Sequence, residues 1–261
     1  MVRGTVAGVE CWRFTALEFD VLWRLCGRDR LPYPMAYRSA AETVDEDRRQ
    51  RQEATHILVR QIDRELQSAL SVLLEPDLRV EVCGFAGAGP TSMTRVHAGI
   101  RGAAAVVVTQ MTGPDTESGG DVRIAVVPRT RVAATVASAV PAAARGAGRR
   151  LVARPDTGNT VMRPVSERGT SDDVRGFLSR RRDGIGEVGV HPGPAVDWRP
   201  TDDGGVFQWI DVEDGRYLIV RTRDVVEVVP VSVDELREHL TALVDRVDRH
   251  RQAKSTSHTA M

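Results

Sequence analysis

The side chains that could carry chemistry in this 261-residue sequence are scattered rather than grouped into a motif. No GxSxG, HExxH or GxxxxGKS/T pattern occurs, so the common signatures of hydrolases, zinc proteases and phosphate loops are missing. The run GFAGAG, residues 84–89, has its glycines in the wrong order for GxGxxG and favours a hairpin loop. The six histidines lack metal-ligand spacing: His56, His97, His191, His239, His250 and His258. We therefore predict no enzymatic activity, no metal site and no cofactor.

Clustered charges in the sequence have structural explanations. Asp172 and Asp173 follow Ser171 at a predicted helix start, where the helix dipole favours anions. The arginines at 180–182 come late in the same helix, where cations complement the exposed carbonyl groups. The acidic pair at 202–203 precedes two glycines and is typical of a turn. These clusters are better explained as caps and turns than as catalytic groups.

The composition excludes several classes of partner. The 36 basic and 36 acidic residues balance, and only 5% of the residues are aromatic, so we predict no binding to nucleic acid. No apolar run approaches the roughly 20 residues of a membrane helix, which predicts no membrane insertion. The three cysteines, Cys11, Cys26 and Cys83, form no CxxC pair and leave one unmatched. This pattern fits a reducing cytoplasm.

The N-terminal elements have clear local signals. Thr15 and Glu18 have the spacing of a capping box at the start of a short helix. The segment LPYP, residues 31–34, cannot continue that helix and predicts a rigid connector, named here the strap. Thr43 and Glu46 form a second predicted box. It begins a helical region that ends before Pro76 and consists of one long helix or two in series.

The sequence also contains an internal repeat. Residues 122–140 and 224–242 both read as strand, proline, hydroxyl cap and helix, with Pro128 placed 102 positions before Pro230. Thr130 and Ser232 are the predicted caps, and Glu235 completes a box with Ser232. Each half reads as helix, several antiparallel strands and helix. We predict an α+β fold, a pseudo-two-fold repeat with a central antiparallel β-sheet flanked by helical bundles.

Boundaries follow from this repeat. The half-repeats span about 44–140 and 171–248, within one domain over residues 1–250. The last stretch, RQAKSTSHTAM at 251–261, is polar and without periodicity, so we expect a disordered tail.

Aromatic residues are the remaining candidates for function. Phe85 lies in the predicted glycine loop, and Phe207 and Trp209 are two apart on a strand, hence on one sheet face. Such a pair usually covers a core. If the face is uncovered, it is instead a surface for a partner.

Three segments of the sequence resemble a known family. FTALEFDVLW, then LPYP, and DGRYLIVRTRDVVEVVPVS before a C-terminal helix look like the EspG family of type VII (ESX) secretion-associated chaperones of actinobacteria. The similarity covers nearly the whole chain. One departure is DVVEVVP, where a tryptophan would be expected before the strand end, and this leaves the family branch open.

The resemblance implies a function. EspG-like proteins are cytoplasmic chaperones with a pseudo-two-fold fold, and they bind the hydrophobic tip of the PPE subunit in a PE-PPE heterodimer. They keep this substrate soluble, deliver it to the secretion machinery and stay behind. A groove between the sheet and the C-terminal helices, with an early-strand loop, would hold the partner. The strap would be scaffold without substrate contact. We expect a monomer or weak homo-oligomer when the partner is absent.

The resemblance also suggests partner-binding residues: Phe85, Phe207, Gln208, Trp209, Leu236, Arg237 and His239. For Leu236, the alternative is a position in the hydrophobic core rather than at the partner surface. If Trp209 is at the site, Trp209→Ala should weaken binding and leave the fold intact. Two other functions stay open: a non-enzymatic scaffold of the same fold that binds another helical partner, and an enzyme with an unrecognised site.

Overall fold

A computed structural model describes the chain apart from residues 7–8, 88–91, 155–164, 196–202 and 260–261. The described strands form one antiparallel sheet in the order β1-β2-β6-β5-β4-β3-β8-β9-β10-β11-β7. With its helices, this sheet makes an α+β fold. The strands are β1 (Val2–Val6), β2 (Val9–Phe14), β3 (Leu78–Ala86), β4 (Ser92–Arg101), β5 (Ala104–Thr112), β6 (Gly119–Pro128), β7 (Leu151–Ala153), β8 (Gly184–Pro192), β9 (Gly205–Val212), β10 (Gly215–Arg221) and β11 (Val226–Pro230).

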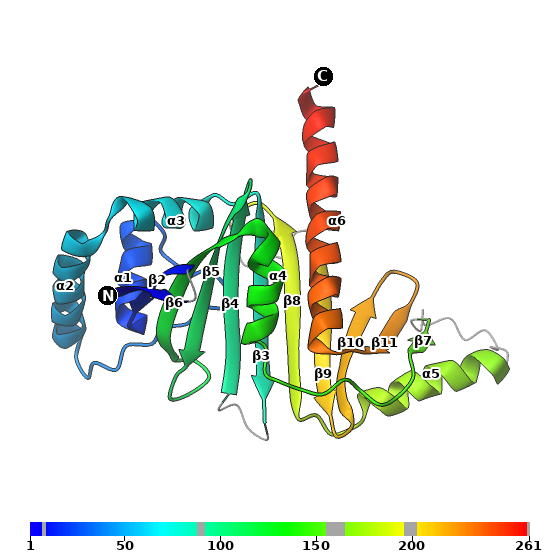
Figure 1. Cartoon of the computed structure of the whole chain (residues 1–261). Helices are drawn as coiled ribbons and strands as arrows, with labels where there is room; N and C mark the ends of the chain where they lie inside the picture. Colours follow the sequence, from blue (N-terminus) through cyan, green and yellow to red (C-terminus); the bar gives the residue numbers. More distant parts are fainter. Residues whose placement is uncertain (7–8, 88–91, 155–164, 196–202, 260–261) are drawn as a thin grey trace.

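Helices cover the two faces of the sheet unequally. On the side called here the front face, α4 (Val132–Ala139) and α6 (Val233–Thr259) pack over the central strands (Figure 1). On the opposite back face, α1 (Ala16–Leu25), α2 (Val44–Gln61) and α3 (Arg64–Leu74) cover the β2-β6-β5-β4 end. The other end of the back face carries α5 (Val165–Leu178). The central strands β3, β8 and β9 lie between these two groups.

Strand alternation sorts the apolar side chains between the faces. In β5, Ala105 and Val107 belong to the front-face core with α4 and α6, whereas Val106 and Val108 belong to the back-face core with α3. Side chains of successive strand residues point to opposite faces. The sheet therefore has apolar cores on both sides.

Two predicted capping boxes are confirmed. The Glu18 amide donates to Thr15 Oγ1 at 3.2 Å, and the Thr15 amide donates to Glu18 Oε2 at 2.8 Å. At the start of α6, the Glu235 amide donates to Ser232 Oγ at 3.2 Å, and the Ser232 amide donates to Glu235 Oε2 at 2.7 Å. Each box satisfies two backbone donors at a helix start.

Two other predicted caps differ from the structure. Thr43 accepts the Glu46 amide at 3.2 Å, but the Glu46 carboxylate accepts from the Glu42 amide, so only half of that box forms. The predicted Thr130 cap is wrong. Thr130 lies inside a 3₁₀ turn, Arg129–Arg131, and this turn continues into α4 without a side-chain cap. The predicted helical region divides into α2 and α3, because Asp63 starts a new helix by accepting the Leu66 amide at 2.8 Å.

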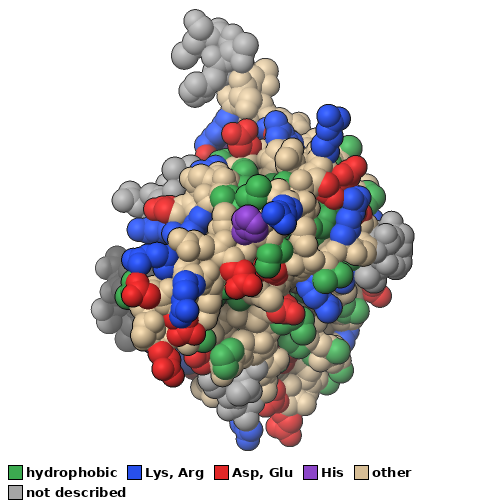
Figure 2. Space-filling model, turned by 90° about the vertical axis from the view of Figure 1, so that its left-hand side faces the viewer, with side chains coloured by type: hydrophobic (Ala, Val, Ile, Leu, Met, Phe, Trp, Pro, Cys, Tyr) green, Lys and Arg blue, Asp and Glu red, His purple; other side chains and the backbone are tan. Residues whose placement is uncertain are grey.

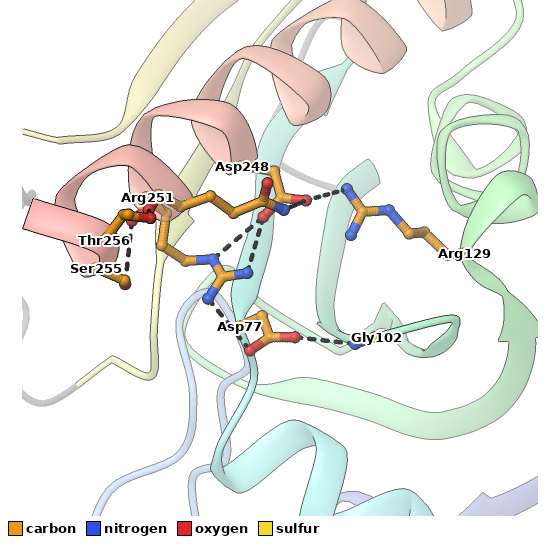
Figure 3. Close-up of polar contacts among 8 residues, drawn as sticks. Asp77, Gly102, Arg129, Asp248, Arg251, Ser255 and Thr256 are labelled. Atoms are coloured by element: carbon orange, nitrogen blue, oxygen red, sulfur yellow. Dashed lines mark hydrogen bonds and ion pairs between the residues drawn. The ribbon is translucent and has the colours of Figure 1, made fainter. Parts of the chain in front are cut away.

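The expected disordered tail is wrong for residues 251–259, which continue α6 (Figure 1). Ion pairs hold the helix where it leaves the sheet (Figure 3). Asp248 is 2.7 Å from Arg129 and 3.0 Å from Arg251, and Arg251 is 3.5 Å from Asp77. Once this region is helical, each further residue adds a backbone hydrogen bond without a new nucleation cost. Periodicity cannot detect such a polar extension.

Candidate functional site

The front face of β9 is closed. Phe207 and Trp209 are 1% and 0% exposed, so this pair covers a core, and the alternative of an uncovered surface for a partner does not apply to it. The Phe207 ring packs edge-on against His239 of α6 with 4.8 Å between ring centroids. Leu236 is also fully buried in this core. Side chains thus fill the space between the sheet and α6 at these residues, where the partner groove was expected.

Trp209 lies directly against two glycines on neighbouring strands. A Cβ atom on Gly186 would be 1.9 Å from Trp209 Cη2, and one on Gly84 would be 2.4 Å from Trp209 Cζ2. Both positions therefore need glycine for close packing rather than for a turn or a phosphate. Because Trp209 is fully buried, Trp209→Ala should open a cavity in the core, contrary to the expectation that it leaves the fold intact.

Part of the back face of β3, β8 and β9 is accessible among the described residues, whereas Arg79, His191 and Ile210 on the same face are buried. We name this surface the open face; Val206 is 40% exposed there and Glu187 is also exposed. Its side chains point away from Phe207 and Trp209 by strand alternation. The open face consists of Phe85, Ile185, Glu187, Val206 and Gln208.

Covered regions border the open face on both sides. Leu66, Leu70 and Leu73 of α3 pack in the back-face core. On the other side, Phe177 of α5 packs against Tyr217, with 4.7 Å between ring centroids. The open face is therefore a strip of strand surface between two helical walls.

A cavity of about 440 Å³ adjoins the open face. The strap, the C-terminal end of α3, and strands β3, β4, β8 and β9 contribute to its lining. The strap is fixed by the sheet, because the Tyr33 carbonyl lies 2.9 Å from His97 Nδ1 and Ala36 exchanges two hydrogen bonds with Gln110, at 2.9 and 2.7 Å. The volume lies within the range of roughly 300–1,000 Å³ common for ligand pockets.

Arg79 organises the polar part of this cavity. It is 2% exposed, donates through Nε to Glu81 Oε1 at 2.9 Å, and donates through Nη1 to the carbonyl groups of residues 192–194. Burial raises the pKa of Glu81, although Arg79 opposes the shift. Burial, aided by Arg79, lowers the pKa of His191 to about 4. His191 is therefore neutral at pH 7, and its 3.8 Å approach to Glu81 is not an ion pair.

Three further titratable groups of this region, His97, Cys83 and Tyr33, are uncharged at pH 7. Burial lowers the pKa of His97 to about 4, so this imidazole is neutral and its Nδ1 can donate to the Tyr33 carbonyl. Burial raises the pKa of the Cys83 thiol. Burial also raises the pKa of Tyr33, and the nearby Cys83, Glu187 and Glu81 add to that shift. A thiolate is the reactive form of cysteine, and these surroundings disfavour it.

The described residues also lack two other features. They include no group of three or more His, Cys, Asp or Glu side chains that could hold a metal ion. No helix within the described ranges is long and apolar enough to span a membrane. On the side of the molecule that carries α1–α3, basic and acidic side chains are interspersed, so no single-sign field forms there (Figure 2).

The structure separates the residues suggested from the sequence. Gln208 lies on the open face, as does Phe85, which belongs to β3 and pairs with Ile185 rather than lying in a loop. The predicted hairpin is confirmed, since β3 pairs with β4; the last two residues of the glycine run, 88–89, lie outside the described residues. Arg237 and His239 are on α6, on the front side, with Arg237 exposed and His239 half-buried.

Sequence reasoning missed Glu187, Val206 and the cavity. The segment GIGEVGV contains one signal, because Gly186, Val188 and Val190 share one face and leave Glu187 on the other. The cavity itself joins residues near positions 30, 80, 187 and 206, and no local pattern connects them.

Comparisons with known proteins agree with this architecture. The solved structure of the Mycobacterium tuberculosis type VII secretion system chaperone EspG5 in complex with the PE25-PPE41 dimer has a similar fold, with a TM-score of 0.58. At 14% identity, the match covers 90% of this chain and 96% of that one. No curated protein sequence matches significantly. A sequence profile of the EspG family, however, matches residues 15–242. The chain therefore belongs to the EspG family.

Proposed function

We propose that this protein is a chaperone that binds PE-PPE heterodimers at the hydrophobic tip of the PPE subunit, keeps them soluble and delivers them to the type VII secretion machinery. Membership in the EspG family is the observation that carries this proposal. The EspG5 chaperone of similar fold was solved with a PE25-PPE41 dimer. The open face provides a surface of the right character on this chain.

The physical basis is burial of apolar surface. Phe85, Ile185 and Val206 are incompletely buried on the open face and would lose contact with water under a partner. Burial contributes about 25 cal/mol per Å² of apolar surface, less the costs of association. A stable interface needs about 1,200–2,000 Å² in total, so contacts must extend beyond these residues onto the flanking helices.

The suggested partner-binding residues take different roles in this proposal. Gln208 and Phe85 contact the partner on the open face. Phe207, Trp209 and Leu236 support that face from the core beneath it. Arg237 and His239 of α6 lie on the other side of the sheet and would touch only a partner that wraps around the molecule.

The protein acts in the cytoplasm and without catalysis in this proposal. The neutral histidines and protonated Cys83 suit a binding surface. Cys11, Cys26 and Cys83 are all free, in keeping with a reducing compartment.

We also propose that the fold is a pseudo-two-fold repeat within one domain, with a bundle of helices beside each half. The order β6-β5-β4-β3 is mirrored by β8-β9-β10-β11 about the β3-β8 pair. Strands β6 and β11 end at Pro128 and Pro230, and each leads to a helix on the front face. This supports half-repeats near 44–140 and 171–248.

Co-expression tests the function. The full chain would be produced with each PE-PPE pair encoded in the same genome and analysed by size-exclusion chromatography with light scattering. At least one pair should form a stable one-to-one-to-one complex and become more soluble, whereas an unrelated helical heterodimer should not. If every pair stays insoluble or elutes separately, the proposal is wrong, and the alternative of a scaffold for another helical partner takes its place.

A further inference from the structure

Glu187 is the charged group of the open face, and it has no counterion among the described residues. It is exposed, and Gln208 Nε2 donates to its Oε2 at 3.0 Å. No described residue forms an ion pair with it. A carboxylate can accept hydrogen bonds at about four lone-pair positions, so Glu187 keeps acceptor capacity for another molecule.

The other charges that the strands contribute to the cavity pair with each other. Arg79 is used by Glu81 and by three backbone carbonyl groups. Outside the strands, Arg28 donates to the Leu74 carbonyl at 3.2 Å and keeps its positive charge, and Asp29 and Arg30 at the rim are adjacent, exposed and opposite in sign. Among the charged groups on the strands that line the cavity, Glu187 is therefore the one without an ion pair within the described residues.

Tyr33 of the strap lies at the mouth of the cavity. It is 38% exposed and lines the cavity together with Glu81 and Glu187. Burial raises the pKa of Tyr33 most, followed by the nearby Cys83 and then by Glu187 and Glu81. Glu187 is thus close enough to the cavity mouth to act electrostatically on groups there.

The rest of the cavity is lined by apolar groups. Trp23, Leu31 and Pro32 form the wall on the strap side, and Leu74 and Val206 also line it. With a volume of about 440 Å³, it has space for more than one side chain. An occupant that matches both parts carries an apolar group next to a cation.

We propose that this cavity receives an apolar side chain of the bound protein partner and that Glu187 pairs with an arginine or lysine next to that side chain. This inference rests on the proposed function and specifies how the open face selects among partners. A partner with a neutral or acidic residue at that place would leave Glu187 unpaired under the interface, which disfavours the wrong complex.

The test measures dissociation constants between variants of the full chain and the PE-PPE pair that co-purifies with it. Glu187→Arg reverses the charge and Glu187→Gln removes it. Glu53→Arg is the matched control, because Glu53 is an exposed carboxylate on α2 away from the cavity. Val206→Trp fills the cavity mouth, and Val152→Trp is its control, since Val152 is a strand valine with 38% exposure elsewhere.

We expect Glu187→Gln to weaken binding about 3- to 10-fold, and Glu187→Arg and Val206→Trp by about 100-fold, in line with losses at paired interface charges and anchors. Both controls should bind within twofold of the natural chain. Replacing the matching basic residue of the PPE subunit by glutamate should restore binding to Glu187→Arg. If the natural complex forms but Glu187→Arg and Val206→Trp bind normally, the inference is wrong and the proposed function stands. If no complex forms with any pair, both fail.

Discussion

The same three strands, β3, β8 and β9, present two opposite surfaces. On the front face, Trp209 and Phe207 are sealed beneath α6. On the back face, one residue away along β9, Val206 and Gln208 remain accessible. Strand alternation separates the two sets by a single position, and the covering helices decide which set becomes core. The large aromatic residues of β9 thus lie in the core, and its smaller, more polar residues lie at the accessible surface.

The largest expected effect is on the front face. Trp209→Ala should lower the free energy of unfolding by about 3–5 kcal/mol, because it removes a fully buried ring and leaves a cavity. Urea denaturation followed by circular dichroism would measure this loss. Val206→Ala, on the other face of the same strand, should change stability by less than about 0.5 kcal/mol. Equal effects of the two substitutions would contradict the contrast between the faces.

Gly186→Ala should have the next largest effect on the free energy of unfolding. The added Cβ would be placed 1.9 Å from the Trp209 ring, so ring or backbone must shift, at a cost of about 3 kcal/mol, the upper end for overpacking. Gly176→Ala in α5 is the control, since nothing lies within 4 Å of its Cβ position. It should stabilise the helix by about 0.5–1 kcal/mol. A tolerated Gly186→Ala would show that Trp209 is not held against β8.

The buried histidines behind the strap predict acid sensitivity. The pKa of His97 is lowered from 6.5 to about 4 in the folded chain. Above pH 6.5 neither state is protonated; between pH 6.5 and 4 only the unfolded chain gains the proton, so stability falls as pH falls. For His97 the loss is about 2 kcal/mol at pH 5.

Urea titrations at pH 7 and pH 5 would measure this loss of unfolding free energy. In His97→Asn, whose amide can still donate to the Tyr33 carbonyl, the difference between the two pH values should shrink by about that amount. His191, with Arg79 and Glu81 around it, keeps its own acid-sensitive contribution in both proteins. An unchanged difference would mean that His97 titrates normally in the folded chain.

The smallest effect on stability is expected at Glu187. Because it is exposed and has no ion pair within the described part of the chain, Glu187→Gln should leave the unfolding free energy within about 0.5 kcal/mol of the natural value. Thermal unfolding of the isolated protein would measure it. A large destabilisation would indicate that Glu187 holds the fold together rather than facing a partner.

Local signals in the sequence were sufficient for some parts of the fold. The boxes at Thr15 and Ser232 could be predicted because each involves residues three apart. The relation between Pro128 and Pro230 predicted matching strand ends from a short motif. The α6 extension beyond residue 250 could not be predicted, because ion pairs with distant residues hold it and no apolar stripe marks it.

The site was harder to predict for a different physical reason. Alternation showed that Phe207 and Trp209 share a face, but it carries no information about which helix covers that face. Gly84 belongs to the run for which the sequence predicts a hairpin loop, whereas the structure shows that it makes room, with Gly186, for the Trp209 ring. Glu187 can be recognised as a candidate site residue only once the fold has placed the strap, β3 and β9 around it.

Site-specific photo-cross-linking tests the central claim, that the back face rather than α6 receives the partner. A photoreactive phenylalanine analogue would replace Gln208 on the open face or Arg237 on the exposed side of α6, and each protein would be illuminated with its PE-PPE pair. We expect a covalent adduct with the PPE subunit from position 208 and none from position 237. An adduct from position 237 alone would contradict this claim and place the partner on the front side of the molecule.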